Sequence, residues 1–210
     1  MRMIIIALAV MVTACNTIER KHVIPPTTNQ ILTRSMDATV QIFTEEGGRG
    51  SGFYIGNKQI MTAFHVVSNL NTRIFYAYND VLHELKLIKF NEDLDLAILE
   101  MVIPISLPIL HLATHEPEIG DRVYSIGFHF GHPLLKVVNS GHVSNLLDFE
   151  GKKNDYMFFN APINRGASGG PVINEYGKVV GINQMIFTKT GDWSGIGVSI
   201  RLSHIQWFMK

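Results

Sequence analysis

The chain of 210 residues is long enough for one sizeable hydrophobic core or for two small barrels packed together. Its 18 lysines and arginines balance its 18 aspartates and glutamates, so its charge gives no reason to expect nucleic acid or an anionic surface as a partner. Cys15 is the single cysteine, which excludes a disulfide bond within the chain. Aromatic and β-branched residues are well represented, which favours an all-β domain stabilised by its core alone.

Residues 1–14 have the pattern of a signal peptide. Arg2 precedes an apolar run from Ile4 to Val12 that is too short to span a bilayer as a mature helix. The sequence Val12-Thr13-Ala14-Cys15 resembles a bacterial lipobox, and this resemblance implies cleavage before Cys15 and lipidation of that residue. The alternative is an ordinary secretory signal that ends beside a cysteine by chance.

Residues 15–34 are polar, contain Pro25-Pro26 and show no sustained apolar period, so we predict a lipid-anchored tether. Several acyl chains on Cys15 would anchor the protein stably to a membrane of the bacterial envelope. Asn16 is not the aspartate associated with retention in the inner membrane, which favours the outer membrane.

Short strand-like runs, separated by turn residues, fill most of the remaining chain. The predicted strands lie within Met36–Phe43, Phe53–Ala63, Thr72–Tyr78, Leu82–Phe90, Leu96–Val102, Arg122–Phe128, Leu134–Leu147 (a strand pair around Gly141), Tyr156–Ile163, Pro171–Ile173, Lys178–Phe187 and Gly195–Ile200. The segment Ile103–Glu118 contains three prolines and has no clear period, so we predict a crossover there. Leu202–Met209 is predicted as a short closing helix with Ser203 as its cap.

The segment from Asn164 to Pro171 places Ser168 between glycines, in the sequence Asn-Arg-Gly-Ala-Ser-Gly-Gly-Pro. Glycine allows a tight turn that leaves backbone N–H groups exposed. We predict that Ser168 is a nucleophile and that the N–H groups of Gly166 and Ser168 stabilise an oxyanion. A glycine-rich turn with an incidental serine is the alternative for this motif alone.

Two further stretches support a catalytic serine. His65 follows a strand-like run, and a histidine there can act as general base because its ordinary pKa lies near neutrality. Asp95 directly precedes the apolar run Leu96–Leu99 and could hold the imidazole in one tautomer. Asp93 continues a polar loop with its neighbours and is the weaker candidate.

The order His, Asp, Ser differs from that of subtilisins and α/β-hydrolases. Together with Gly50–Phe53, Thr62–Val67, Asp95–Ile98, Asn164–Pro171, Gly177–Asn183 and Gly195–Ile200, it resembles the HtrA-type (Deg-like) branch of the trypsin-like serine proteases. The resemblance covers roughly Met36 to Ile205. It implies two antiparallel six-stranded β-barrels, about 35–103 and about 119–201, within a protease domain at 35–210.

The resemblance also implies a serine endopeptidase that needs no cofactor and cleaves proteins or peptides through an acyl-enzyme. Ile163 and the segment Gly181, Ile182 and Asn183 would bind the substrate, and this segment would pair with it as an added strand. Because no acidic residue stands there, we expect small or medium aliphatic residues before the cut. HtrA relatives are commonly trimers, so a homo-oligomer is possible here, and no length remains after Lys210 for a PDZ domain.

Two readings compete with these predictions. His129, His132, His111 and His115 suggest a metal site, but they lie in loop-like segments without a cysteine partner or an HExxH helix, so we predict no metal. A protease-like fold that binds peptides without cutting them is the second alternative. Ala167 stands where relatives often carry Asn or Asp, which keeps that alternative open.

Overall fold

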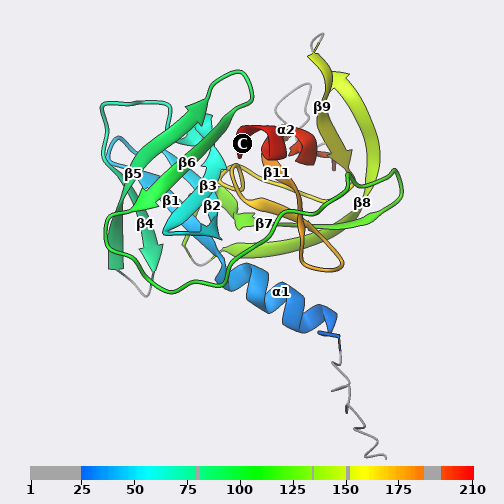
Figure 1. Cartoon of the computed structure of the whole chain (residues 1–210), viewed down its shortest axis with the longest axis horizontal. Coiled ribbons are helices and arrows are strands. Elements are labelled where there is room, and N and C mark those ends of the chain that lie inside the picture. The colour runs from blue at the N-terminus through cyan, green and yellow to red at the C-terminus, as the bar shows by residue number, and fades with distance from the viewer. Residues whose placement is uncertain (1–24, 79–80, 134, 150–151, 187–194) are drawn as a thin grey trace, which may run out of the picture.

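The strands form two closed six-stranded barrels side by side (Figure 1). The computed structural model describes residues 25–78, 81–133, 135–149, 152–186 and 195–210. The predicted signal peptide, Cys15 and most of the tether therefore lie outside the described residues. The prediction of an all-β, trypsin-like pair of barrels is confirmed.

The first barrel contains six antiparallel strands in the order β1-β2-β3-β6-β5-β4. They are β1 (Thr39–Thr44), β2 (Arg49–Gly56), β3 (Gln59–Ala63), β4 (Ile74–Tyr78), β5 (Val81–Asn91) and β6 (Leu96–Met101), with a 3-10 turn η1 (Phe64–Val66) after β3. Side chains of a strand alternate between the two faces of the sheet, and Ile42, Ile60 and Leu99 from three strands meet in one buried cluster. This packing gives β3 and β6 a fixed relative position.

The second barrel has the order β10-β11-β12-β9-β8-β7. Its elements are β7 (Arg122–Phe128), a 3-10 turn η2 (His129–Gly131), β8 (Lys136–Phe149), β9 (Lys152–Phe159), β10 (Pro171–Asn174), β11 (Val179–Ile186) and β12 (Gly197–Arg201). A core cluster joins the barrels, with Phe53 and Met61 from the first against Ile126 and Ile182 from the second. This shared core fixes the position of one barrel relative to the other.

Gly141 lies within one long strand, β8, and the predicted turn at this position is wrong. It pairs with Val123 of β7, with no break in the ladder on either side. A Cβ atom at this position would lie 2.7 Å from Oδ1 of Asn160 and 2.9 Å from Cβ of Ala161. The glycine therefore allows a close approach between segments, which sequence alone does not distinguish from a turn.

A helix, α1 (Thr28–Asp37), precedes the first barrel where a tether and the start of a strand were predicted. Thr27 and Gln30 form a capping box, in which the Thr27 hydroxyl accepts from the N–H of Gln30. Ile31 and Met36 pack against the cluster that joins the barrels. Packing therefore orders residues that looked unstructured in the sequence, and β1 begins only at Thr39.

The predicted closing helix is confirmed as α2 (Leu202–Phe208), but Ser203 is not its cap. Arg201 occupies the N-cap without a capping side chain, and Oε1 of Glu116 accepts from the N–H of Ser203 at 2.7 Å. The cap thus comes from the crossover between barrels. Among the helices of the described ranges, none has the length and apolar character needed to cross a membrane.

Candidate active site

His65 and Asp95 are brought together by two neighbouring strands of the first barrel. β3 leads into η1, which carries His65, and β6 starts immediately after Asp95. Nδ1 of His65 lies 2.7 Å from Oδ2 of Asp95, and the backbone N–H of His65 donates to Oδ1 at 2.8 Å. The carboxylate therefore fixes both the imidazole and the backbone that bears it, as required of the orienting acid in a catalytic triad.

The Asp95 backbone is also held firmly. Its φ is +55°, in the left-handed region that few residues other than glycine adopt. Its carbonyl accepts from the N–H of Phe64 at 3.0 Å, and its own N–H donates to the carbonyl of Glu92 at 3.1 Å. The side chain of Asp95 is 15% exposed and that of His65 is 49% exposed, so His65 presents part of its ring to solvent.

The loop around Ser168 has a hydrogen bond to each of four consecutive carbonyl groups. The carbonyls of Arg165, Gly166, Ala167 and Ser168 accept from Phe130 N (2.6 Å), Ser51 Oγ (2.7 Å), Gly170 N (3.0 Å) and Ser51 N (2.8 Å), respectively. Buried carbonyl groups need such partners, and here each partner also fixes the direction of a peptide plane.

The N–H groups of the same loop divide into two sets. Those of Ala167 and Gly169 donate to the carbonyls of Asn164 (3.0 Å) and Asn183 (2.7 Å). Within the described residues, the N–H groups of Gly166 and Ser168 donate to no protein acceptor. These are the two groups predicted from sequence to bind an oxyanion, and unpaired donors beside a nucleophile are what that role requires.

Gly166 must be glycine for this arrangement. Its φ is +91°, and a Cβ atom would lie 2.4 Å from the carbonyl oxygen of Phe128 and 2.5 Å from the nitrogen of Gly131. Both contacts are with backbone, which a side-chain rotation cannot relieve. The oxyanion loop, defined here as residues 164–169, is therefore built against η2.

The hydroxyl of Ser168 donates to the carbonyl of Gln184 at 2.9 Å. In the part of the chain that the structure describes, no hydrogen bond joins Ser168 to His65. Gln184 lies at a bulge, where the pairing of β11 with β12 shifts between Asn183 and Met185. The Ser168 hydroxyl therefore points to the Gln184 carbonyl in this structure, and its predicted role as a nucleophile activated by His65 stays a prediction.

The predicted substrate residues are mostly covered by the protein itself. The side chains of Ile163, Ile182 and Asn183 are buried, the two isoleucines within core clusters. Oδ1 of Asn183 accepts from the hydroxyl of Ser125 at 2.9 Å. Contact of these side chains and of Gly181 with a substrate therefore stays a prediction.

The predicted strand addition along Gly181–Asn183 is wrong, because both edges of this segment are already occupied. Gly181 and Ile182 pair with β12 on one side and with β10 on the other. The N–H and carbonyl of Asn183 bond to Gly170 (2.8 Å) and Gly169 (2.7 Å). Within the described residues, Met185 and Ile186 of β11 pair with β12 alone, and the Gln184 carbonyl beside them accepts from the Ser168 hydroxyl.

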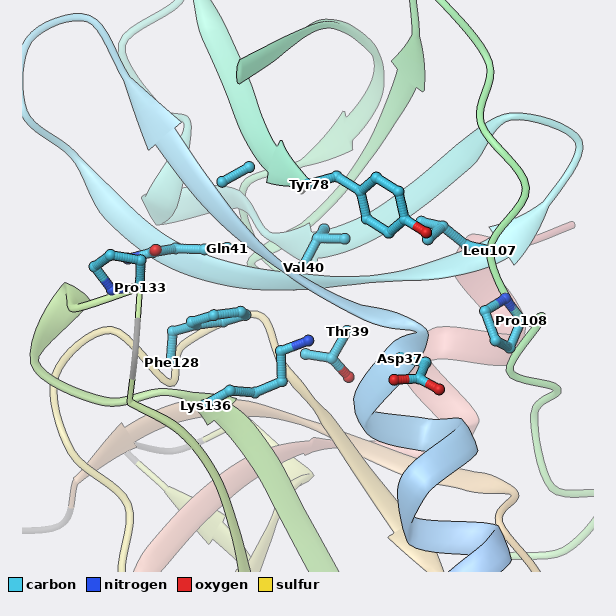
Figure 2. A pocket seen from close by; sticks show the side chains of 11 residues that line it. Asp37, Thr39, Val40, Gln41, Tyr78, Leu107, Pro108, Phe128, Pro133 and Lys136 are labelled. Carbon is cyan, nitrogen blue, oxygen red and sulfur yellow. The ribbon is translucent and has the colours of Figure 1, made fainter. Parts of the chain in front are cut away.

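A pocket of about 470 Å³ opens between the barrels near the end of α1, and no triad residue lines it (Figure 2). Figure 2 shows Tyr78 and Leu107 on one side of it and Phe128 and Lys136 on the other. Burial lowers the pKa of Lys136, whose Nζ donates to the carbonyl of Met36 at 2.9 Å. The pocket is therefore separate from the residues predicted to do chemistry.

His129 is buried beside the oxyanion loop. Its Nδ1 lies 3.1 Å from Nδ2 of Asn164, and burial lowers its pKa. Within the described residues, no three His, Cys, Asp or Glu side chains lie close enough to hold a metal ion. His129 therefore contacts Asn164 in buried surroundings that disfavour the protonated imidazole.

Sequence reasoning missed three residues that hold the site, Ser51, Phe130 and Gln184. Two of them act through backbone atoms, which leave no signature in the sequence. Ser51 could have been found, because Gly50-Ser51-Gly52 is one of the motifs that carry the family resemblance.

A family model described as a trypsin-like peptidase domain matches residues 50–182. The chain belongs to this family. It is 34% identical over 158 residues to a probable periplasmic serine endoprotease DegP-like of Rickettsia prowazekii, covering 72% of this chain and 31% of that protein. It is 31% identical over 170 residues to Protease Do-like 1, chloroplastic, of Arabidopsis thaliana, covering 77% and 38%. The trypsin-like chain thus spans about a third of the length of these curated relatives.

Solved structures agree with this assignment. The serine endoprotease from Yersinia pestis superposes with a TM-score of 0.73 at 29% identity, over 89% of this chain and 66% of that one. The Rv3671c protease from M. tuberculosis in its active form superposes with a TM-score of 0.76, over 87% of this chain and 84% of that one. Its sequence identity of 21% supports the fold alone. The resemblance to HtrA-type proteases is confirmed.

Proposed function

We propose that the protein is a serine endopeptidase. The observation that carries this proposal is that, among the residues that the structure describes, the N–H groups of Gly166 and Ser168 donate to no protein acceptor. The His65–Asp95 pair supplies the remaining chemistry, because it offers a general base held in one orientation. Relatives that carry the name serine endoprotease support the same activity.

The reaction would begin when Ser168 turns from the Gln184 carbonyl to Nε2 of His65. Its Oγ attacks the peptide carbonyl while His65 takes the proton, and Asp95 stabilises the imidazolium. The N–H groups of Gly166 and Ser168 hold the oxyanion of the tetrahedral intermediate. His65 then protonates the leaving amine. Water attacks the acyl-enzyme while His65 takes its proton, and His65 returns that proton to Oγ of Ser168 as the acid product leaves.

An extended substrate would pair with β11 from Gln184 to Ile186. This form of recognition uses main-chain hydrogen bonds and accepts many sequences, which suits unfolded or envelope proteins as substrates. A substrate N–H that bonds to the Gln184 carbonyl would compete with the Ser168 hydroxyl for it. Substrate binding would then favour the rotamer in which Ser168 reaches His65.

Side-chain preference is proposed to be for small or medium aliphatic residues before the cut. No acidic residue occurs among the four predicted substrate residues Ile163, Gly181, Ile182 and Asn183. Sequencing the products of an unfolded protein tests this preference, and a predominance of Lys or Arg before the cut would contradict it.

The protein is proposed to act at the bacterial cell envelope, anchored by lipid at Cys15. The sequence of residues 12–15 and the periplasmic relatives of Rickettsia and Chlamydia support this location. Mass spectrometry of the N-terminal peptide tests it, because lipidation requires a modified Cys15 at the new terminus. A homo-oligomer, such as a trimer, is tested by light scattering of the purified chain.

The activity is tested with the whole chain and its Ser168→Ala variant, using casein and a fluorophosphonate probe. We expect labelling and cleavage in the parent and neither in the variant. Labelling that persists in Ser168→Ala would contradict the assigned nucleophile. A folded parent that binds casein without labelling or cleavage would support the alternative of a catalytically silent binding module, which the unpaired N–H groups do not favour.

A further inference from the structure

Ser51 lies on β2 of the first barrel, and its hydroxyl and backbone N–H bond to the second barrel, while its carbonyl accepts from the Thr62 hydroxyl of β3 at 2.7 Å. Its hydroxyl donates to the carbonyl of Gly166 at 2.7 Å, and its backbone N–H donates to the carbonyl of Ser168 at 2.8 Å. The residue is fully buried. One residue of the first barrel therefore holds the carbonyl groups of two residues whose N–H groups are proposed to bind the oxyanion.

The direction of the Ser51 hydroxyl is fixed by its second partner. The N–H of Phe128 donates to Oγ at 2.9 Å, and an N–H group can only donate. Oγ must therefore accept from Phe128, which leaves its single proton for the carbonyl of Gly166. Because Ser51 is fully buried, its hydroxyl is shielded from bulk solvent.

Gly166 needs such a support more than another residue would, because glycine has wide freedom in φ and ψ. The N–H of Gly166 shares a peptide plane with the carbonyl of Arg165, and this carbonyl accepts from the N–H of Phe130 at 2.6 Å. Its own carbonyl is held by Ser51. With both adjoining peptide planes fixed, the N–H of Gly166 has one direction, opposite to the Arg165 carbonyl in the same trans peptide.

We propose that Ser51 is a positioning residue for catalysis, which ties the oxyanion loop to the first barrel and thereby aims the N–H of Gly166. This inference rests on the proposed peptidase function. It also links the two halves of the site, because β2 pairs with β3, which leads to His65. Ser51 thus sets the loop of the nucleophile in register with the strands that carry the base.

The replacement Ser51→Ala removes the hydroxyl, so the carbonyl of Gly166 and the N–H of Phe128 both lose their hydrogen-bond partner. The oxyanion forms only during the reaction, so the loss should appear in kcat and leave KM nearly unchanged. Removal of one oxyanion donor costs on the order of 100- to 1,000-fold in kcat, so a misaimed donor should cost about 10- to 100-fold. Binding of a peptide boronate, which imitates the tetrahedral intermediate, should weaken by a similar factor.

The experiment compares the whole chain with Ser51→Ala, Ser51→Cys and Ser35→Ala, using a fluorogenic peptide derived from a mapped cleavage site. Ser35 is the matched control, because it is equally buried and donates to the carbonyl of Ile31 at 2.8 Å, within α1. Its replacement should lower thermal stability without changing kcat. Ser51→Cys keeps a weak donor and should recover part of the kcat lost in Ser51→Ala.

Equal kcat values in Ser51→Ala and Ser35→Ala, or a loss that falls on KM alone, would overturn the proposal. If Ser51→Ala does not fold, Ser51→Cys provides the test. A lowered kcat at unchanged KM would support the proposal, and an unchanged kcat would overturn it. A parent chain that does not react with the fluorophosphonate would instead overturn the proposed function, and the role of Ser51 with it. The two failures are thereby distinguished by the parent alone.

Discussion

His65 and Asp95 are joined by two hydrogen bonds to one carboxylate, one from the ring and one from the backbone. Nδ1 of His65 lies 2.7 Å from Oδ2, and the His65 N–H donates to Oδ1 at 2.8 Å. A carboxylate accepts both bonds, so the ring must carry a proton on Nδ1, and in its neutral form it presents Nε2 as the acceptor. The arrangement selects the tautomer that a general base needs.

Replacing Asp95 by Asn tests this relationship. The amide oxygen can still accept from the His65 backbone, but the NH₂ group then faces Nδ1 and favours the opposite tautomer. We expect kcat to fall about 1,000- to 10,000-fold in peptide hydrolysis, with little change in thermal stability. Asp93→Asn, in the same loop, serves as the control and should retain the parent rate. An active Asp95→Asn variant would contradict the assigned role of the carboxylate.

Gly166→Ala should remove both activity and stability. The added Cβ would lie 2.4 Å from the Phe128 carbonyl oxygen, at a φ of +91°. Backbone strain of this kind costs about 1–3 kcal/mol, and the clash adds to it. We expect hydrolysis to fall more than about 100-fold and the free energy of unfolding to fall by about 3 kcal/mol or more.

Gly120→Ala is the matched control for Gly166→Ala. Gly120 has a φ of +96°, and nothing lies within 4 Å of an added Cβ there. The replacement introduces the backbone strain without the clash. We therefore expect the free energy of unfolding to fall by about 1–2 kcal/mol and the rate of hydrolysis to stay unchanged. Equal effects of the two replacements, measured by denaturant unfolding, would show that crowding against η2 is not what requires glycine at position 166.

The candidate triad could be predicted because each member stands beside a local pattern. Asp95 directly precedes a buried strand, Ser168 lies between glycines, and His65 follows an apolar run. Two supports of the site, Phe130 and Gln184, could not be predicted in the same way, because they depend on how segments that are distant in sequence meet within the second barrel. The Phe130 N–H and the Gln184 carbonyl are backbone groups that any residue would supply.

Errors in the predicted fold have a similar origin. Gly141 and a turn glycine look alike in sequence, and the unbroken pairing with β7 and the approach of Asn160 and Ala161 distinguish them. Strand addition at Asn183 is prevented because Gly170 bonds to this residue, a contact set by the serine loop. Local propensity also predicted no helix at α1, where contacts with the barrels decide the structure.

Thr27→Ala should weaken α1 without affecting hydrolysis. Thr27 accepts from the N–H of Gln30, and Oε1 of Gln30 accepts from the N–H of Thr27 at 2.9 Å. Loss of an N-cap costs about 1 kcal/mol, which denaturant unfolding can measure. Thr28→Ala is the control, because Thr28 is exposed and starts the helix. A larger loss from Thr28→Ala would contradict the capping box.

His129 should make the protein less stable as the pH is lowered. Burial lowers its pKa from the ordinary value of 6.5, so the unfolded chain binds more protons than the folded chain below that pH. Its contribution to stability is therefore fully present above about pH 6.5 and is lost as the pH falls toward the folded pKa. Protonation would also place an Nδ1–H group against the amide of Asn164, a residue of the oxyanion loop.

Denaturant unfolding at about pH 7.5 and about pH 5.5 measures this effect in the parent chain and in His129→Gln. Gln cannot take up a proton, so the variant should show a smaller difference between the two values. His132→Gln changes an exposed histidine of the same loop and should keep the parent's difference. If His129→Gln retained the full difference, other groups would account for it, and His129 would not be the residue that destabilises the oxyanion loop in acid.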